Sequence, residues 1–508
     1  MISRFILAAV AIVNVNVIPM DRERVEPAQT VLVDGDRIIA VGAASIAGGT
    51  TIIDGTGQYL LPGLTDAHVH LLGFGPGPRE NFADGRIYLA NGITTVINLG
   101  GPAGPNRSTE LDWKRRIEAG TLVGPTIYTA GAFINEPRVS TPEEVEREIR
   151  SQVRDGYDLI KFHELDGTTT GLSLAAYRTM IDTTREIGIP LVGHAPNNLG
   201  IDVLLDARQP LAHIGNLSNI YFLPLLAHRG YLLTTATAFF LLIASAALSG
   251  APPFSRWAAA TAFAAFVFLA LLLPGGPLFE SLESRATVTA LTVFIAMDAV
   301  ASAILAVAIW RDPRASRLSQ VRATLVPAAS GALALVLALF WTPVAWRSSD
   351  RGIDALAARV RAAGISVQST LVVYQAIGGL NRLYKLPAFN RKVMRALHRA
   401  GVPIVAGTDA RGIPQLVPGI SLHWELQLLR DCGLSPYEVI YAATVAPSHF
   451  LGKDRDFGTI AVGERADLLL VRKNPLEDLS TLADPVGVMT RGRWFGPEEL
   501  HRMRGDLK

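Results

Sequence analysis

The stretch Tyr59–Leu71, YLLPGLTDAHVHL, decides the fold class of this chain. It reads as an apolar strand that ends in two histidines, His68 and His70. Residues two apart on a strand point to the same side, so the two imidazoles face the same way. Paired polar side chains at the end of a buried strand are typical of parallel α/β proteins, whose functional residues gather at the C-terminal ends of the strands.

Seven more strand-like runs follow, and they alternate with helical patterns such as Pro142–Arg154 and Leu174–Ile187. This alternation indicates a parallel α/β architecture. Eight units predict a TIM-like (β/α)8 barrel with its active site at the C-terminal ends of the strands. The predicted strands are Leu64–His70, Thr94–Leu99, Pro125–Ala130, Leu159–Phe162, Pro190–His194, Leu211–Ile214, Ser366–Val373 and Pro403–Thr408.

Polar residues stand at the ends of several of these strands. His194 ends the fifth, His213 the sixth and Asp409 the eighth. Four imidazoles and a carboxylate are suitable ligands for zinc and similar divalent ions. A single histidine at a strand end is more often only hydrogen-bonded. The joint pattern, in this order and at one edge of the barrel, predicts a metal site.

Lys161 ends the fourth strand, in the run LIKFH. Burial beside cations favours the neutral amine of a lysine. A neutral amine can add carbon dioxide to form a carbamate, whose two oxygens can bridge two metals. Two alternatives stay open: Lys161 could pair with Glu164, and His163 offers a competing ligand at the same position.

The two ends of the chain carry short strands of another kind. Residues 13–53 contain turns at Asp34-Gly35-Asp36 and Asp54-Gly55, and residues 458–493 contain similar strands. We expect residues 1–63 and 451–508 to form one small β-sandwich. The barrel then occupies residues 64–217 and 351–450, with an insertion at 218–350.

The composition of this insertion is unusual. The whole chain has 18% charged residues, below the average of about 25%, and residues 218–350 contain only eight Arg, no Lys and five Asp or Glu. A bilayer crossing takes roughly 20 apolar residues. The sequence therefore predicts a four-helix transmembrane insertion, although a bundle of buried helices is the alternative. The predicted spans are Gly230–Ser249, Trp257–Leu273, Ala286–Trp310 and Ala323–Trp346.

These spans predict a multi-pass protein of the cell membrane with the lipid bilayer as a partner. Arginines flank the spans on both sides in similar number, so the positive-inside rule leaves the side of the barrel open. The four arginines in residues 311–322 favour an extracytoplasmic barrel. The start MISRFILAAVAIV is either a signal-like segment or a strand. The net charge of +2, without basic runs interleaved with aromatics, argues against nucleic acid as a partner.

The chain resembles the amidohydrolase superfamily, and within it the imidazolonepropionase-like and prolidase-like branch. The resemblance is carried by YLLPGLTDAHVHL, NGITTVINLGG, DLIKFHE, PLVGHA, AGTDA, SLHWELQLLRDCGLSPYEVIYAATVAPSHFLG and GTIAVGERADLLLV. It implies two divalent metal ions, with zinc as the expected element. His68, His70 and Asp409 would hold one ion, His194 and His213 the other, and carboxylated Lys161 would lie between them.

The resemblance implies a hydrolase of carbon–nitrogen bonds, in which a metal-activated hydroxide attacks the scissile carbonyl of an amide or peptide-like small molecule. Asp409 would take the proton and deliver it to the leaving nitrogen. His163 and His423 could line the substrate pocket, or have only packing roles.

The insertion follows His213, on the catalytic face, which suggests an apolar or N-acylated substrate. The alternatives are a membrane-tethered Xaa-Pro-type dipeptidase acting on soluble peptides, and a catalytically inactive binding or regulatory module. Homo-oligomerisation stays open.

Overall fold

The computed structural model describes residues 10–73, 82–104, 108–164, 171–222, 285–380, 386–413 and 415–505. The chain divides into two compact units, which we treat separately. The first consists of Met1–Asn216, Ala358–Ala376 and Arg391–Lys508, and the second of Leu217–Ala357 and Ile377–Asn390. The domain boundaries expected from the sequence remain predictions.

The first unit contains a closed ring of eight parallel strand positions. Seven are strands, and the isolated bridges of Leu211 to Gly193 and to Val367 supply the eighth. Backbone hydrogen bonds from Ala67 to Ala406 and from Asp409 to His68 close the ring. The α/β barrel is therefore as predicted. Its strands are β6 (Leu64–Val69), β7 (Ile93–Asn98), β8 (Thr126–Thr129), β9 (Ile160–Phe162), β10 (Leu191–Gly193), β11 (Val367–Gln368) and β12 (Ile404–Val405).

Buried apolar side chains of the barrel strands belong to one cluster, the apolar layer, which also includes Ala446, Leu451 and Phe457. Its members on or beside the strands include Ala67, Ile97, Ala130, Leu159, Val192, Ala212 and Val405. Two polar residues stand two positions further along the same strands, Lys161 after Leu159 and His194 after Val192. Side chains two apart share one face of a strand, so these polar groups lie directly above the apolar layer. We call this end of the barrel, where the strands have their C-terminal ends, the mouth.

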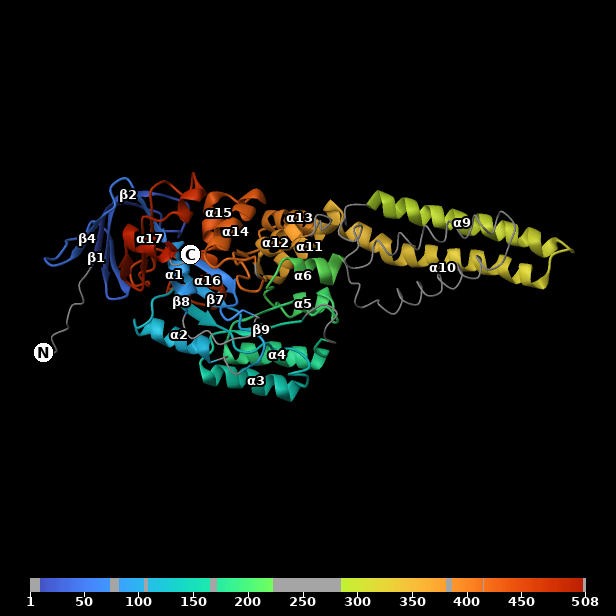
Figure 1. Ribbon diagram of the computed structural model, residues 1–508, viewed down its shortest axis with the longest axis horizontal. Helices are drawn as coiled ribbons and strands as arrows, with labels where there is room; N and C mark the ends of the chain where they lie inside the picture. The colour runs from blue at the N-terminus through green and yellow to red at the C-terminus, as the bar shows by residue number, and fades with distance from the viewer. Residues whose placement is uncertain are drawn as a thin grey trace. The chain divides into compact units, whose positions relative to one another are not determined.

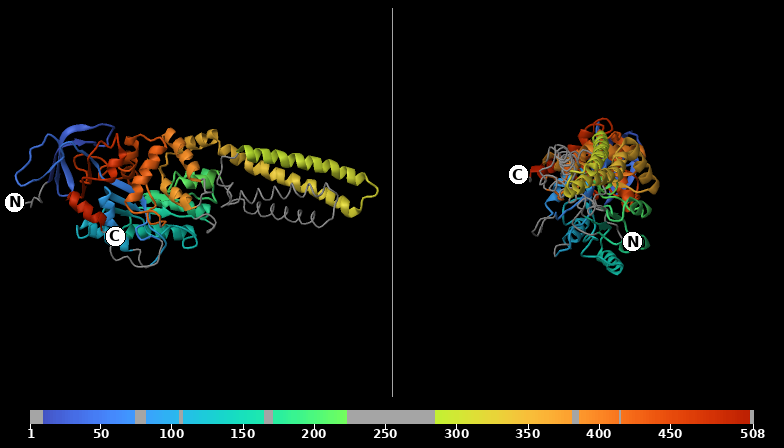
Figure 2. Two further views of the ribbon diagram at one scale, coloured as in Figure 1. Left: turned by 45° about the horizontal axis from the view of Figure 1, so that its top comes forward. Right: turned by 90° about the vertical axis from the view of Figure 1, so that its right-hand side faces the viewer.

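Two amphipathic segments form outer helices as predicted, α3 (Pro142–Asp155) and α4 (Leu174–Ile187). Thr141 and Glu144 make a capping box at the start of α3, and Gly156 ends it in the left-handed conformation. Both views in Figure 2, like Figure 1, show α3 and α4 side by side.

The remaining helices of the described chain outside α9 and α10 are mostly short. They are α1 (Asp84–Ala90), α2 (Thr109–Glu118), α5 (Ile201–Asp206), α6 (Gly215–Leu217), α11 (Asp350–Ala363), α12 (Leu371–Leu380), α13 (Leu386–Arg399), α14 (Ile420–Asp431), α15 (Pro436–Ala442), α16 (Val445–Leu451) and α17 (Pro497–Gly505). The predicted strand Ser366–Val373 is too long, because β11 stops at Gln368. The backbone of Thr370 turns to a φ of 41°, and α12 begins at the next residue.

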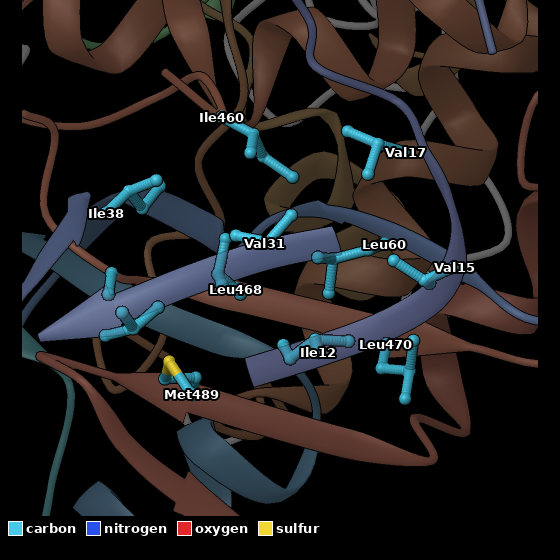
Figure 3. Close-up of a cluster of buried hydrophobic side chains, with 12 residues drawn as sticks. Ile12, Val15, Val17, Val31, Ile38, Leu60, Ile460, Leu468, Leu470 and Met489 are labelled. Carbon is cyan, nitrogen blue, oxygen red and sulfur yellow. The ribbon is translucent and has the colours of Figure 1, made fainter. Parts of the chain in front are cut away.

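Both chain ends contribute to one eight-stranded sheet. Its order is β15-β14-β13-β5-β1-β2-β3, with β4 paired to β1. Figure 1 shows the C-terminal elements, in red, beside the N-terminal strands, in blue. Figure 3 shows the apolar cluster inside this sheet, in which Ile12 and Leu60 meet Leu468 and Met489. The strands are β1 (Val10–Val17), β2 (Glu26–Asp34), β3 (Arg37–Gly42), β4 (Thr51–Asp54), β5 (Tyr59–Pro62), β13 (Leu468–Val471), β14 (Gly487–Thr490) and β15 (Arg493–Phe495).

A buried arginine joins this sheet to the barrel. Arg465, only 2% exposed, donates to Asp467 at 2.6 Å and to Asp456 at 2.8 Å. It also donates to the hydroxyl of Thr95, on β7, at 3.1 Å. A buried charge requires such partners, because an isolated one is costly to desolvate.

The second unit contains two long helices, α9 (Arg285–Arg311) and α10 (Arg317–Arg347), which run antiparallel and side by side (Figure 1). The indole of Trp310 donates to the hydroxyl of Thr324 at 2.9 Å. At the other end of α10, the guanidinium of Arg347 lies 5.1 Å from the ring centre of Tyr221.

The transmembrane prediction is corrected here. Gly230–Ser249 and Trp257–Leu273 lie outside the described residues, and the other two predicted spans fall within α9 and α10. Spanning about 30 Å of hydrocarbon requires a long and almost uninterrupted apolar helix. In the part of the chain that the structure describes, no helix meets that requirement. The four-helix transmembrane insertion and the multi-pass membrane location are therefore wrong. Apolar composition did not distinguish a spanning helix from one that packs on a neighbouring helix.

Candidate metal centre

Six polar side chains predicted from the sequence lie at the mouth, at or just beyond the ends of their strands. We call them the polar cluster. His68 lies within β6 and His70 directly follows it, Lys161 lies within β9, His194 directly follows β10, His213 follows the bridge at Leu211, and Asp409 follows β12.

Asp409 lies at the centre of the measured contacts. One of its carboxylate oxygens, Oδ1, is 3.1 Å from Nε2 of His70 and 3.4 Å from Nε2 of His68. Potential ligand atoms of His68, His213 and Asp409 all lie within 4.8 Å of one another. The His213 ring centre is 4.4 Å from that of His68 and 5.1 Å from that of His194. This spacing is compact enough for shared coordination of a cation.

The second ring nitrogen of each imidazole is held by a neighbour. In three of the four histidines, Nδ1 lies within hydrogen-bond distance of a backbone carbonyl, which can only accept. Nδ1 must then carry the proton, and the lone pair is left on Nε2. Such outer hydrogen bonds orient metal-ligating histidines. The carbonyls are Ala212 for His68 at 3.0 Å, Gly100 for His70 at 2.7 Å and Glu164 for His194 at 2.6 Å.

The electrostatic environment keeps these groups in the forms that bind a cation. Burial, together with neighbouring basic groups, lowers the pKa of His68 and of His194 well below the usual value, and that of His213 to about 3. Burial raises the pKa of Asp409, but the contacts with His70, His213 and Lys161 together lower it overall. At neutral pH the imidazoles of His68, His194 and His213 are uncharged and Asp409 is ionised.

Lys161 is fully buried, and burial lowers the pKa of its amine to about 7. Its Nζ makes no hydrogen bond with any of the described residues. A buried amine without a partner is costly, so its presence beside four imidazoles needs an explanation. A cation bound among these side chains would explain the buried amine. The donor set of imidazole nitrogens and carboxylate oxygens fits a divalent metal.

His163 lies beside the polar cluster. Its ring stacks on Phe133 with centres 4.2 Å apart and an interplanar angle of 2°, and its centre is 4.3 Å from that of His194. Burial and the nearby Lys161 lower the pKa of His163 to about 3. It is a neutral group at the edge of the site.

His423 is not brought to this cluster. Its Nε2 lies 2.9 Å from the carbonyl of Asn91, which ends α1 just before β7 begins. That position is at the N-terminal end of the strand, and the polar cluster is at the C-terminal ends. The geometry of His423 is that of a residue bridging two outer elements.

Two positions at the mouth escaped the sequence reasoning. Asp66 accepts hydrogen bonds from Thr408, which precedes Asp409, and Thr370 lies against His213. Asp66 carried a signal, since it is a carboxylate inside an apolar strand that ends in the two histidines. Thr370 carried no such signal, because the sequence around it is typical of a continuous strand and does not indicate the turn between β11 and α12.

The comparisons with known proteins agree with this geometry. The model of the amidohydrolase family matches residues 333–495. This part of the chain is therefore similar to the amidohydrolase family. The matched range contains Asp409, Thr370 and the whole of α14.

Curated relatives match this chain over short segments. The enamidase of Eubacterium barkeri is 39% identical over 84 residues, 16% of this chain and 22% of the relative. The imidazolonepropionase of Deinococcus deserti is 40% identical over 91 residues, 17% of this chain and 21% of the relative. The alignments thus span about a fifth of the length of these relatives.

Solved structures share the fold of this chain over almost its whole length. A Xaa-Pro dipeptidase with bound methionine aligns with a TM-score of 0.59 at 16% identity, over 96% of this chain and 100% of the other. Molinate hydrolase aligns with a TM-score of 0.60 at 17% identity, over 98% of this chain and 96% of the other. At these identities the likeness is one of fold.

Proposed function

We propose that this protein is a metal-dependent hydrolase that cleaves a carbon–nitrogen bond, of the amide or peptide type, in a small molecule. The observation that carries the proposal is the approach of ionised Asp409 to His68 and His70, above the buried amine of Lys161, which has no hydrogen-bond partner among the described residues. The named relatives, such as enamidase and imidazolonepropionase, act on carbon–nitrogen bonds, which supports the proposed reaction class.

Two groups of ligands would hold the metal. His68, His70 and Asp409 suit one cation, and His194 and His213 suit a second. Lys161, carboxylated by addition of its neutral amine to carbon dioxide with loss of a proton, would lie between them. Zinc fits these nitrogen and oxygen donors. A bound divalent ion supplies Lewis acidity, which polarises the scissile carbonyl and makes a water molecule more acidic.

The proton transfers fall to Asp409. Its lowered pKa leaves the carboxylate ionised at neutral pH, so a carboxylate oxygen can accept the proton of the attacking water. The protonated carboxyl then returns that proton to the leaving nitrogen, which departs as a neutral amine.

The substrate is proposed only as a class. The expectation of an apolar or N-acylated substrate depended on a membrane insertion beside the mouth, and that insertion is contradicted. His163 and Phe133, stacked at the edge of the polar cluster, provide a flat apolar surface for part of the substrate. Within the described residues nothing supports a lipid bilayer or a second copy of the chain as a partner.

The test measures hydrolysis across dipeptides, N-acyl amino acids and cyclic amides, with metal content determined on the same sample. We expect hydrolysis of at least one class, its loss after treatment with a chelator, and its return with Zn²⁺. Asp409→Asn should lower kcat by about 10²–10⁴-fold, the range for loss of a general acid–base group.

Asp454→Asn is the matched control, because Asp454 is half exposed and forms an ion pair with the half-exposed His449. Full activity of the Asp409→Asn protein would refute the proposed site. Metal binding without hydrolysis of any class would favour a binding module.

A further inference from the structure

One histidine of the polar cluster is held differently from the other three. Nδ1 of His213 lies 2.9 Å from the hydroxyl Oγ1 of Thr370, where the others face backbone carbonyls. A carbonyl can only accept, whereas a hydroxyl both donates and accepts. The neighbour of His213 therefore does not by itself decide which ring nitrogen carries the proton. His213 can act as a ligand through Nε2 only when the Thr370 hydroxyl accepts from Nδ1.

The place of that hydroxyl depends on an unusual backbone turn. Thr370 is fully buried and has a φ of 41°, in the left-handed region that β-branched residues rarely adopt. The turn lies between the end of β11 at Gln368 and the start of α12 at Leu371. Such a conformation persists only where the surroundings impose it.

Glu425, a residue of another helix, contacts the chain directly after this turn. This fully buried residue of α14 accepts hydrogen bonds from the backbone N–H of Leu371 at 3.0 Å and of Val372 at 2.7 Å. The first N–H groups of a helix have no partner inside that helix, and an anion there is favoured by the helix dipole. One carboxylate thus binds the two residues that directly follow Thr370.

We propose that Glu425 and Thr370 are positioning residues of the proposed metal centre: Glu425 fixes the turn, and Thr370 fixes the orientation and tautomer of His213. The inference rests on the proposed function, since it assigns the two residues to a metal ligand. The simpler alternative is that Glu425 only stabilises the start of α12. The two readings differ in what they predict for metal binding.

The experiment compares Thr370→Val, Thr370→Ser, Glu425→Gln and the unaltered protein. Each is titrated with Zn²⁺ against a competing chelator, and the visible absorption of each Co²⁺-loaded protein is recorded. Removing an outer partner of a metal ligand typically costs about 10–100-fold in metal affinity. We expect that loss, with an altered Co²⁺ spectrum, for Thr370→Val and Glu425→Gln, and recovery of both for Thr370→Ser, which keeps the hydroxyl.

Thr141→Ala is the matched structural control. Thr141 caps α3, where its hydroxyl accepts from the N–H of Glu144, and α3 lies on the outside of the barrel. It should lower stability and leave Zn²⁺ affinity unchanged. If Glu425→Gln does not fold, Glu425→Asp replaces it, because the shorter side chain withdraws the carboxylate from Leu371 and Val372.

The outcomes separate the two proposals. Unchanged Zn²⁺ affinity and Co²⁺ spectrum in folded Thr370→Val and Glu425→Gln overturn this inference alone. Failure of the unaltered protein to bind Zn²⁺ or Co²⁺ overturns the proposed function as well. A loss of affinity no larger than that of Thr141→Ala assigns Glu425 to stability only.

Discussion

Asp66, on the first barrel strand β6, accepts two hydrogen bonds from Thr408, which follows the last barrel strand β12. The backbone N–H of Thr408 donates at 3.0 Å and its hydroxyl donates at 2.7 Å. Asp66 stands two residues before His68, and Thr408 directly precedes Asp409. One pair of residues therefore joins the two strands that carry the central contacts of the polar cluster.

Replacing Asp66 by alanine should destabilise the fold and lower activity together. The change leaves the N–H and the hydroxyl of Thr408 buried without this acceptor, at about 1–3 kcal/mol for each group. Urea denaturation of the metal-free protein measures the loss. Asp66→Asn keeps one acceptor oxygen and should lose less. An unfolding free energy unchanged in Asp66→Ala would show that the pair does not hold the strands together.

Lys161 should make stability depend on pH above neutrality. Burial lowers its folded-state pKa to about 7, whereas the unfolded chain keeps the ordinary 10.5. Between these values the unfolded chain binds one more proton, so the free energy of unfolding rises with pH, by about 1.4 kcal/mol per pH unit at most.

The measurement compares the metal-free protein with Lys161→Met from pH 7 to 10, in buffer purged of carbon dioxide. The unaltered protein should gain stability relative to the variant as the pH rises. Parallel curves for the two proteins would mean that the amine is not desolvated in the folded state.

Arg465 should contribute strongly to stability without contributing to chemistry. Its replacement by methionine leaves the carboxylates of Asp467 and Asp456 without their buried partner, and breaking such a pair costs about 3–5 kcal/mol. Thermal and urea unfolding give the magnitude. We expect kcat per folded molecule to stay constant, because the residue lies between the sheet and the barrel strands. A fall in kcat without loss of stability would contradict this role.

Replacement by glutamine should affect the kinetic constants at His163 and leave them unchanged at His423. His423→Gln should leave kcat and KM unchanged, because its ring faces the carbonyl of Asn91 away from the mouth. His163→Gln should alter KM or kcat, because its ring stacks on Phe133 and lies beside His194. Steady-state kinetics of the two variants on one substrate decide between them. A raised KM in His423→Gln alone would reverse the assignment.

Much of the site could be predicted from the sequence because parallel barrel strands share one edge. Once His68, His70, Lys161, His194, His213 and Asp409 are assigned to strand ends, their meeting follows from the architecture. Strand lengths were less predictable: the run Ser366–Val373 reads as a single strand, yet it turns at Thr370 and continues as α12. A similar ambiguity affected the insertion, because helices that cross a membrane and helices that pack on a neighbouring helix are both rich in apolar residues.

The sequence by itself determined the periodic alternation of strands and helices, and with it the barrel and the polar residues at its mouth. Local patterns suffice there, because each strand end is defined by its own residues. Only the tertiary structure decided which groups hold those residues in place. Asp66 and Thr408 are 342 positions apart, and Glu425 lies 54 positions from the N–H of Leu371. Such pairs form only when the closed barrel brings distant strands and helices within hydrogen-bond distance, and no local pattern records that distance.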